Sequence, residues 1–269
     1  MENKTRHILG VSGGKDSAAL AVYLRDRVPN MEYVFCDTGK ELKETYEYID
    51  KLEVYLNKHI IRLPEELDDI SDTNPFDYYL EKLGNFLPNP QARWCTKDLK
   101  LKPFEDFIGT DTVINYVGIR ADEMRKGYIS TRSNVKTVFP FVEDGITKDG
   151  VMNILNESGL KLPTYYEWRS RSGCYFCFYQ RKSEWLGLKE RHPDLFEQAK
   201  NYEKENFTWN EKFSLDIFDD PDFVQSIKDE QNKKIKSKKQ VRPNATLIEI
   251  LDEIQDEEDI MKPCLICHL

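Results

Sequence analysis

The chain has 269 residues, 39% apolar and 32% charged, enough for one large α/β domain or for such a domain with a smaller appendage. Its formal charge of −9, from 39 Lys and Arg against 48 Asp and Glu, argues against a generally basic nucleic-acid-coating surface but is compatible with a local basic groove. The sequence contains no run of roughly 18 apolar residues and no signal-peptide pattern. We therefore expect a cytoplasmic protein that makes no membrane contact.

The first half of the chain alternates short apolar runs with helical periodicity. The pattern predicts strands at 7–11, 31–36, 59–63 and 113–119, with helices at 17–27 and 41–56. Because the helices are too short for anything but crossovers, the strands should be parallel and the connections right-handed. The sequence therefore predicts a doubly wound, mostly parallel α/β sheet.

The strand signal fades after about residue 145. Helices are predicted at 146–159, 183–191 and 193–205. We therefore divide the chain into an α/β domain, 1–145, and a helical C-terminal region, 146–269, that carries cysteine motifs.

Two oppositely charged stretches lie in the C-terminal region. Residues 233–242 hold six basic side chains, and residues 249–259 hold seven acidic ones. We interpret them as solvated or paired with each other.

A phosphate-binding loop is predicted between the first strand and the first helix, where residues 12–17 read SGGKDS. The glycines Gly13 and Gly14 let the backbone approach an anion closely, and the N-terminal N–H groups of the helix point at it. Ser12 and Ser17 add hydroxyls, and Lys15 adds a positive charge. This combination suits a polyphosphate.

The loop is not a Walker A motif, which would require Gly at position 9 and Ser or Thr at position 16, where this chain has Leu9 and Asp16. The sequence SGGKDS resembles instead the PP-loop of ATP pyrophosphatases, a superfamily that includes the sulfonucleotide reductases. Segments resembling the PAPS-reductase-like branch follow in order at 35–41, 94–96, 118–123 and 173–177. The resemblance covers residues 7 to about 205 and implies an adenine nucleotide alpha hydrolase-like fold with a nucleotide-binding first domain.

This resemblance also implies ATP and Mg²⁺ as ligands. ATP-cleaving members carry the lysine and aspartate that stand here as Lys15 and Asp16, whereas sulfonucleotide reductases match the loop only loosely. We therefore expect an enzyme that cleaves ATP to AMP and pyrophosphate. Lys15, with magnesium, would neutralise the charge of the departing pyrophosphate.

Other candidate ligands follow the second and fourth strands. Asp37 should lie where ligands bind in open α/β sheets and could hold the magnesium of MgATP; Glu41 could join it or be a first-turn helix acid. Arg120 and Arg125 could bind phosphates or form ion pairs with Asp122 or Glu123. The predicted catalytic residues are Lys15, Asp16, Asp37 and Arg120, and the predicted nucleotide-binding residues are Ser12, Gly13, Gly14, Lys15, Asp16, Ser17, Asp37, Thr38, Gly39, Gly118 and Arg120.

The six cysteines include two C-x-x-C pairs, a spacing that favours metal or redox chemistry in a reducing compartment. Cys95, Cys174 and Cys177 resemble the ligand pattern of the iron–sulfur members of the branch. With Cys264 or Cys267 as the fourth ligand, the resemblance implies a 4Fe-4S cluster. A structural zinc on the two pairs and free redox thiols are the alternatives. Cys36, the remaining cysteine, is predicted to be a buried small hydrophobe.

The acceptor of the reaction is suggested by the resemblance alone. Within the PAPS-reductase-like branch, the members that have an intact ATP loop and cluster cysteines, as this chain does, resemble the DNA phosphorothioation proteins of the DndC and SspD type. This implies a sulfurtransferase that adenylates DNA or transfer RNA, with a cysteine desulfurase as sulfur donor; a homodimer is compatible with the sequence. The alternatives are a phosphoadenylyl or adenylyl sulfate reductase and a non-catalytic nucleotide-binding module.

Three arginines, Arg169, Arg171 and Arg181, flank the first C-x-x-C pair. They could bind a nucleic-acid backbone. They could equally form salt bridges to Glu167 and Glu184.

Overall fold

The computed structural model describes residues 5–64, 74–123, 130, 132–205, 207–246, 249–251, 253 and 254. Internal contacts divide the chain into two units. The described part of the first runs to residue 78 and from 94 to 163; that of the second comprises residues 79–93 and those from 164 onward. The division predicted from the sequence, between 145 and 146, lies before helix α7 (Lys148–Ser158), which packs on helix α1 (Lys15–Leu24) of the first unit.

A five-stranded parallel sheet forms the centre of the first unit, in the order β3-β2-β1-β4-β5. The strands are β1 (Arg6–Gly10), β2 (Met31–Cys36), β3 (Ile60–Leu63), β4 (Val113–Tyr116) and β5 (Val135–Val138). The predicted α/β class with a parallel sheet is therefore confirmed. Strand β5 was not predicted, because it has four residues and is only partly buried.

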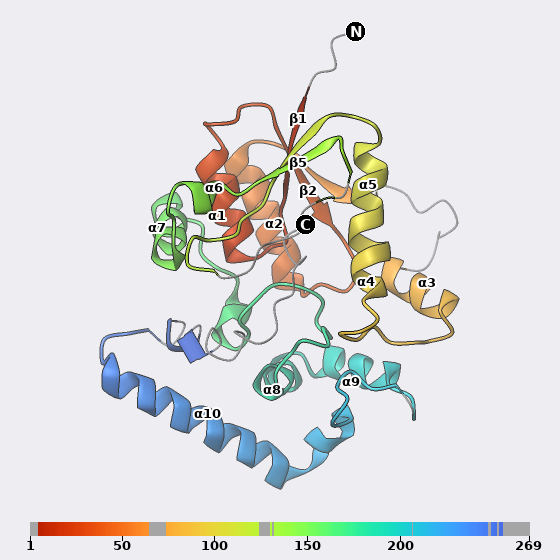
Figure 1. Ribbon diagram of the computed structural model, residues 1–269. Coiled ribbons are helices and arrows are strands. Elements are labelled where there is room, and N and C mark those ends of the chain that lie inside the picture. The colour runs from red at the N-terminus through yellow and green to blue at the C-terminus, as the bar shows by residue number, and fades with distance from the viewer. Residues whose placement is uncertain are drawn as a thin grey trace. The chain divides into compact units, whose positions relative to one another are not determined.

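Helices cover both faces of this sheet. The helices are α1, α2 (Lys43–Leu56), α3 (Pro75–Lys82), α4 (Trp94–Thr96), a π-helical turn (Lys97–Leu101), α5 (Lys102–Ile108), α6 (Pro140–Glu143) and α7. Leu9 of β1 packs in a core with α1, α2 and α7, whereas the next residue back, Ile8, packs in a second core with Phe104 of α5. Adjacent strand residues point to opposite faces, so β1 is buried on both sides of the sheet. Figure 1 shows α1, α2 and α7 on one side of the sheet and α5 on the other.

The second unit is helical, as predicted for the C-terminal part. It contains α8 (Lys182–Arg191), α9 (Pro193–Tyr202), α10 (Pro221–Val241) and 3₁₀ turns at Thr164–Glu167 and Leu215–Asp219. Its core is aromatic: Phe176 stacks on Trp209 with ring centroids 4.6 Å apart, and Trp185 is fully buried. Gly187 permits close packing, since a Cβ there would lie 2.5 Å from Cε3 of Trp168.

Helix α10 (Figure 1) pairs several of its basic residues with acidic ones. Lys234 contacts Glu230 at 2.7 Å, and Lys238 and Arg242 both pair with Glu253. The two contacts with Glu253 join the charged stretches, in agreement with the second of the two interpretations, solvation or mutual pairing. Among the described helices, none combines the length and apolar character that a membrane span requires.

Candidate functional site

The predicted phosphate loop is closed by a serine hydroxyl. Ser17 Oγ accepts a hydrogen bond from the Ser12 backbone N–H at 3.1 Å and donates to the Gly14 carbonyl oxygen at 3.2 Å. Ser12, Lys15 and Ser17 are all buried, with Lys15 only 7% exposed. The loop is therefore folded on itself around the start of α1, with its lysine out of bulk water.

Glycine is required at Gly13 for two reasons. Its φ of +73° is in the left-handed region, and a Cβ there would lie 2.5 Å from Thr45 Cγ2. At the N-cap of α1, Gly14 offers no side-chain oxygen to the first-turn N–H groups. The positive end of the helix can therefore serve an anion.

Asp37 is held in a fixed orientation after β2. Its Oδ1 accepts hydrogen bonds from the Gly39 backbone N–H and from the Tyr46 hydroxyl, both at 2.8 Å. Burial, together with the charges of Asp37 and Glu41, raises the pKa of Tyr46. A half-buried, oriented carboxylate fits magnesium, which prefers oxygen ligands. No motif pointed to Tyr46, which reaches Asp37 from α2.

Arg120 follows β4 and lies among carboxylates. Its Nη1 contacts Asp16 Oδ1 at 3.1 Å and Glu123 Oε1 at 3.5 Å, and its Nε contacts Asp122 Oδ1 at 3.1 Å. Burial lowers the pKa of Arg120, but the three carboxylates raise it by more. The predicted ion pairs with Asp122 and Glu123 are present, and the structure adds a contact to Asp16 that joins two predicted site residues.

The three candidate loops follow adjacent strands. Strand β1 lies between β2 and β4, so chain connections leave it in both directions along the sheet. Ligands bind at the carboxyl edge of such a switch point. Gly118 brings the loop after β4 against the phosphate loop, since a Cβ there would lie 3.0 Å from the Asp16 carbonyl oxygen. Arg125 lies outside the described residues.

The first C-x-x-C pair lies on a tight turn of the second unit. The Cys177 backbone N–H donates to the Cys174 carbonyl oxygen at 3.1 Å, and both cysteines are partly exposed. The residues between them, Tyr175 and Phe176, are buried. Two sulfur ligands on one turn fit a zinc or an iron–sulfur centre.

The complete ligand set stays a prediction. Cys95 lies in α4 of the first unit, and Cys264 and Cys267 lie outside the described residues. Within the described ranges, no three His, Cys, Asp or Glu side chains gather as a metal site. Cys36 is buried, and burial raises the pKa of its thiol to about 12, so it behaves as the predicted small hydrophobe.

A buried carboxylate, Glu184, binds residues on both sides of the cysteine turn in the sequence. It accepts hydrogen bonds from Ser170 N (2.9 Å), Ser170 Oγ (2.8 Å) and Arg181 N (3.0 Å). Burial raises the pKa of Glu184, but Arg171, Arg181 and Arg169 lower it by more. The charges of these arginines therefore act on Glu184, and their binding of a nucleic-acid backbone stays a prediction.

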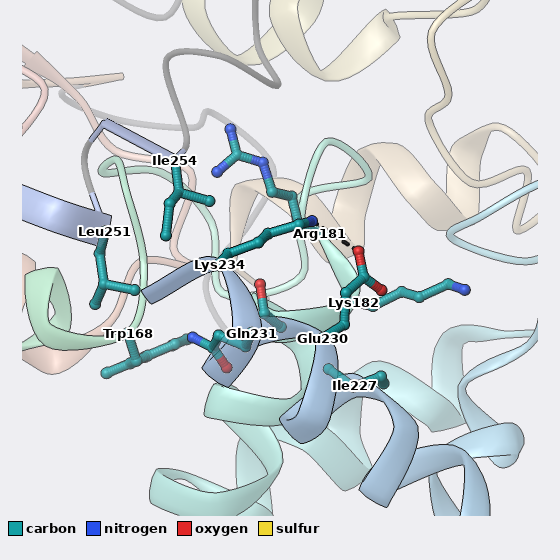
Figure 2. A pocket seen from close by; sticks show the side chains of 10 residues that line it. Trp168, Arg181, Lys182, Ile227, Glu230, Gln231, Lys234, Leu251 and Ile254 are labelled. Carbon is teal, nitrogen blue, oxygen red and sulfur yellow. Dashed lines mark hydrogen bonds and ion pairs between the residues drawn. The ribbon is translucent and has the colours of Figure 1, made fainter. Parts of the chain in front are cut away.

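A separate hollow of about 190 Å³ lies in the second unit. Figure 2 shows charged side chains of α10 on one wall and Leu251 and Ile254 on another. The lining residues are Trp168, Arg181, Lys182, Ser183, Ile227, Glu230, Gln231, Lys234, Leu251 and Ile254. Arg181, one of the three candidate arginines, is among these described side chains, but none of the predicted nucleotide-binding residues is.

Comparison with known proteins gives a consistent picture. Residues 6–177 match the family model for the phosphoadenosine phosphosulfate reductase domain. An uncharacterized protein of Methanocaldococcus jannaschii is 26% identical over 204 residues, which cover 69% of this chain and 44% of that protein. The tRNA-specific 2-thiouridylase MnmA of Colwellia psychrerythraea is 30% identical over 127 residues, which cover 42% of this chain and 32% of that protein.

The matches are partial in length. The chain spans less than half of the first two curated relatives, both from M. jannaschii. A crystal structure of phosphoadenylyl-sulfate reductase from Candida auris, in complex with phosphate, matches with a TM-score of 0.47 and 14% identity, over 64% of this chain and 82% of that one.

Proposed function

The chain belongs to the phosphoadenosine phosphosulfate reductase domain family, and from this premise we propose that it cleaves ATP to AMP and pyrophosphate while adenylating an acceptor for sulfur insertion. The acceptor is a nucleic acid, as in DNA phosphorothioation of the DndC and SspD type or in transfer RNA thiolation. The name of one relative, tRNA-specific 2-thiouridylase, says that this relative acts on transfer RNA. A cysteine desulfurase supplies the sulfur.

The contact between Arg120 and Asp16 carries this proposal. It joins the loop after β4 to the phosphate loop after β1, with Nη1 and Oδ1 3.1 Å apart. Buried Lys15 and oriented Asp37 belong to loops of the same sheet edge. This edge supplies an anion-binding helix end, a cation for the phosphates and a carboxylate for magnesium, which are the groups that phosphoryl and nucleotidyl transfer need.

In the first step, an acceptor oxygen attacks the α-phosphorus of ATP. A bond forms between that oxygen and phosphorus as the bond to the oxygen bridging the α- and β-phosphates breaks, and pyrophosphate leaves. The Lys15 ammonium and the first-turn N–H groups of α1 stabilise the charge of the leaving group. Magnesium, with Asp37 as a ligand, would supply further charge neutralisation.

In the second step, a hydrosulfide or persulfide attacks the activated acceptor atom. The new sulfur bond forms as the bond from that atom to the adenylated oxygen breaks, and AMP leaves with that oxygen. If the donor is a persulfide, a thiol reductant then splits the sulfur–sulfur bond. An iron–sulfur cluster on Cys174 and Cys177, with ligands from Cys95 and Cys264 or Cys267, or a zinc in its place, is proposed as the second cofactor.

Pyrophosphate release from labelled ATP tests the proposal, measured without acceptor, with duplex DNA and with transfer RNA. Wild type should release pyrophosphate with at least one nucleic acid. Lys15→Ala should reduce release by about 10²- to 10³-fold, as loss of a group that stabilises a developing negative charge does. Lys51→Ala, on an exposed position of α2, is the matched control and should be unchanged.

Two outcomes would replace the proposal. Sulfite release from phosphoadenylyl sulfate with thioredoxin, without ATP consumption, would assign the reductase activity after which the family is named. Nucleotide binding without pyrophosphate release in any mixture would assign a non-catalytic module. Equal release by wild type and Lys15→Ala would remove the phosphate loop from the reaction.

A further inference from the structure

Arg169 is an unusual buried arginine. Its side chain is only 1% exposed. One nitrogen, Nη2, donates to the Cys174 carbonyl oxygen at 2.8 Å. The other two, Nε and Nη1, have no hydrogen-bond partner within the described residues. Buried polar groups are nearly always paired, and buried charges are costly unless compensated, so this guanidinium points to a ligand.

The carboxylate nearby does not account for these two donors. Glu184 is buried, and its hydrogen bonds come from Ser170 and from the Arg181 backbone. Three guanidinium groups act on it, those of Arg171, Arg181 and Arg169. Glu184 therefore leaves Nε and Nη1 of Arg169 without an acceptor, and an anionic group beside Arg169 would compensate its buried charge.

The cysteine turn lies directly against this guanidinium. Gly173 has a φ of +125°, and a Cβ there would lie 3.8 Å from Arg169 Nη2. The turn is also held by Gln180, which is 4% exposed and donates from Nε2 to the Tyr175 carbonyl oxygen at 2.7 Å. The buried side chains of Arg169 and Gln180 thus fix the backbone of the turn that carries Cys174 and Cys177.

We propose that Arg169 is a positioning residue for an anionic metal–thiolate centre on Cys174 and Cys177, to whose sulfur atoms its unused Nε and Nη1 hydrogens would be donated once the metal is bound. Two thiolates would bring negative charge beside the buried Arg169 guanidinium, and sulfur accepts N–H hydrogen bonds that tune such centres. The inference rests on the metal centre of the proposed function. It adds the residue that orients and neutralises that centre, whether the metal is iron or zinc.

The test compares Arg169→Lys and Arg169→Met with wild type after anaerobic purification. Iron, zinc and sulfide are measured per chain, followed by the metal affinity in competition with a chelator. Groups that orient metal ligands contribute about 10- to 100-fold in metal affinity, and we expect a loss of that size in both variants. Arg171→Lys is the matched control, because Arg171 also acts on Glu184 but lies 5.3 Å over the Tyr179 ring. It should bind metal like wild type.

A measurement on wild type keeps the test decisive where a variant fails to fold. Exchange of the Arg169 N–H hydrogens for deuterium should shift the metal–sulfur stretching frequencies in vibrational spectra. No shift, or variants that bind metal like wild type and merely unfold at lower denaturant concentration, would make Arg169 a purely structural residue. Wild type without iron or zinc would remove the centre and this inference together, whereas pyrophosphate release would still report on the ATP-cleaving function separately.

Discussion

The two units of this protein fix their candidate loops by different means. In the first, the loops leave the ends of parallel strands, and glycines allow backbone to lie against backbone or side chain, as Gly118 does at Asp16. In the second, Arg169 and Gln180 hold the turn of Cys174 and Cys177. Buried Glu184 binds the backbone of the flanking residues Ser170 and Arg181. The loops of the first unit should therefore be disrupted when a side chain is added at a glycine. The turn of the second unit should be disrupted when a buried charge is removed.

The largest effect on stability is expected in the second unit, from Glu184→Gln. This change removes the buried negative charge on which three arginines act and should lower the free energy of unfolding by about 3 to 5 kcal/mol. The exposed pair of Glu190 with Lys228, 2.7 Å apart, provides the control, since Glu190→Gln should cost at most about 1 kcal/mol. Denaturant unfolding followed by tryptophan fluorescence measures both. Equal losses would show that burial of charge does not distinguish this unit.

A slightly smaller effect is expected from volume added to the phosphate loop. Gly13→Ala adds a left-handed backbone strain and a clash with Thr45, together about 2 to 4 kcal/mol, and should abolish nucleotide binding. Gly109→Ala isolates the backbone term, because Gly109 has a φ of +53° and open space around it; it should cost about 1 kcal/mol and leave binding intact. Calorimetric unfolding and nucleotide titration check both. A tight-binding Gly13→Ala variant would contradict the close-packing argument.

Acid should loosen the turn of the second unit in a defined way. The folded pKa of Glu184 lies below its ordinary value of 4.5 because the arginines outweigh burial. Its stabilising contribution is therefore complete above pH 4.5 and is lost only as pH falls through the lower folded pKa. Hydrogen-exchange protection of the Ser170 and Arg181 amides, which donate to Glu184, should follow this loss.

That measurement is specific to one carboxylate. Glu203, elsewhere in the same unit, has a pKa raised by burial. Its contribution to the free energy of unfolding therefore changes with pH in the opposite direction, and unfolding of the whole protein would report the sum of both effects. Protection of the two amides that fades with a midpoint at or above pH 4.5 would mean that the arginines do not dominate.

The smallest effect is expected on the surface of α10. Lys234→Ala removes a pair with Glu230, one helical turn away at 2.7 Å, and should cost about 0.3 to 0.5 kcal/mol. The pKa of Glu230, which the hydrogen bond from Lys234 lowers, should return toward its ordinary value. A nuclear magnetic resonance titration of Glu230 measures this. A loss of several kcal/mol would instead give α10 a structural importance like that of Glu184.

Much of the first unit was predictable because its signals are local. Apolar runs separated by a glycine-containing loop predicted β1, β2, β3 and β4 to within a few residues. Strand β5 was not predicted because a four-residue, half-buried edge strand carries little periodic signal. Helix α7 was predicted as a helix but assigned to the C-terminal region, since periodicity identifies an apolar face without telling which surface covers it.

The second unit was less predictable because its key features depend on burial. Arginine is mostly a surface residue, so sequence alone offered no reason to bury Arg169. Salt bridges to Glu184 were one of two open interpretations of the arginines, and the sequence contained no sign that Glu184 would be buried and bound by the Ser170 and Arg181 backbone N–H groups. Buried polar networks join residues that are distant along the chain, which a linear pattern does not record.

The two edges of the described sheet have a consequence for solubility. Strands β3 and β5 are each four residues long, and each carries one exposed cationic side chain within it, Arg62 in β3 and Lys136 in β5. A strand from another copy that paired with either edge would bring its own backbone beside that charge. Short, charged edges of this kind oppose edge-to-edge aggregation, so the sheet can stay open at both sides without inviting fibre growth.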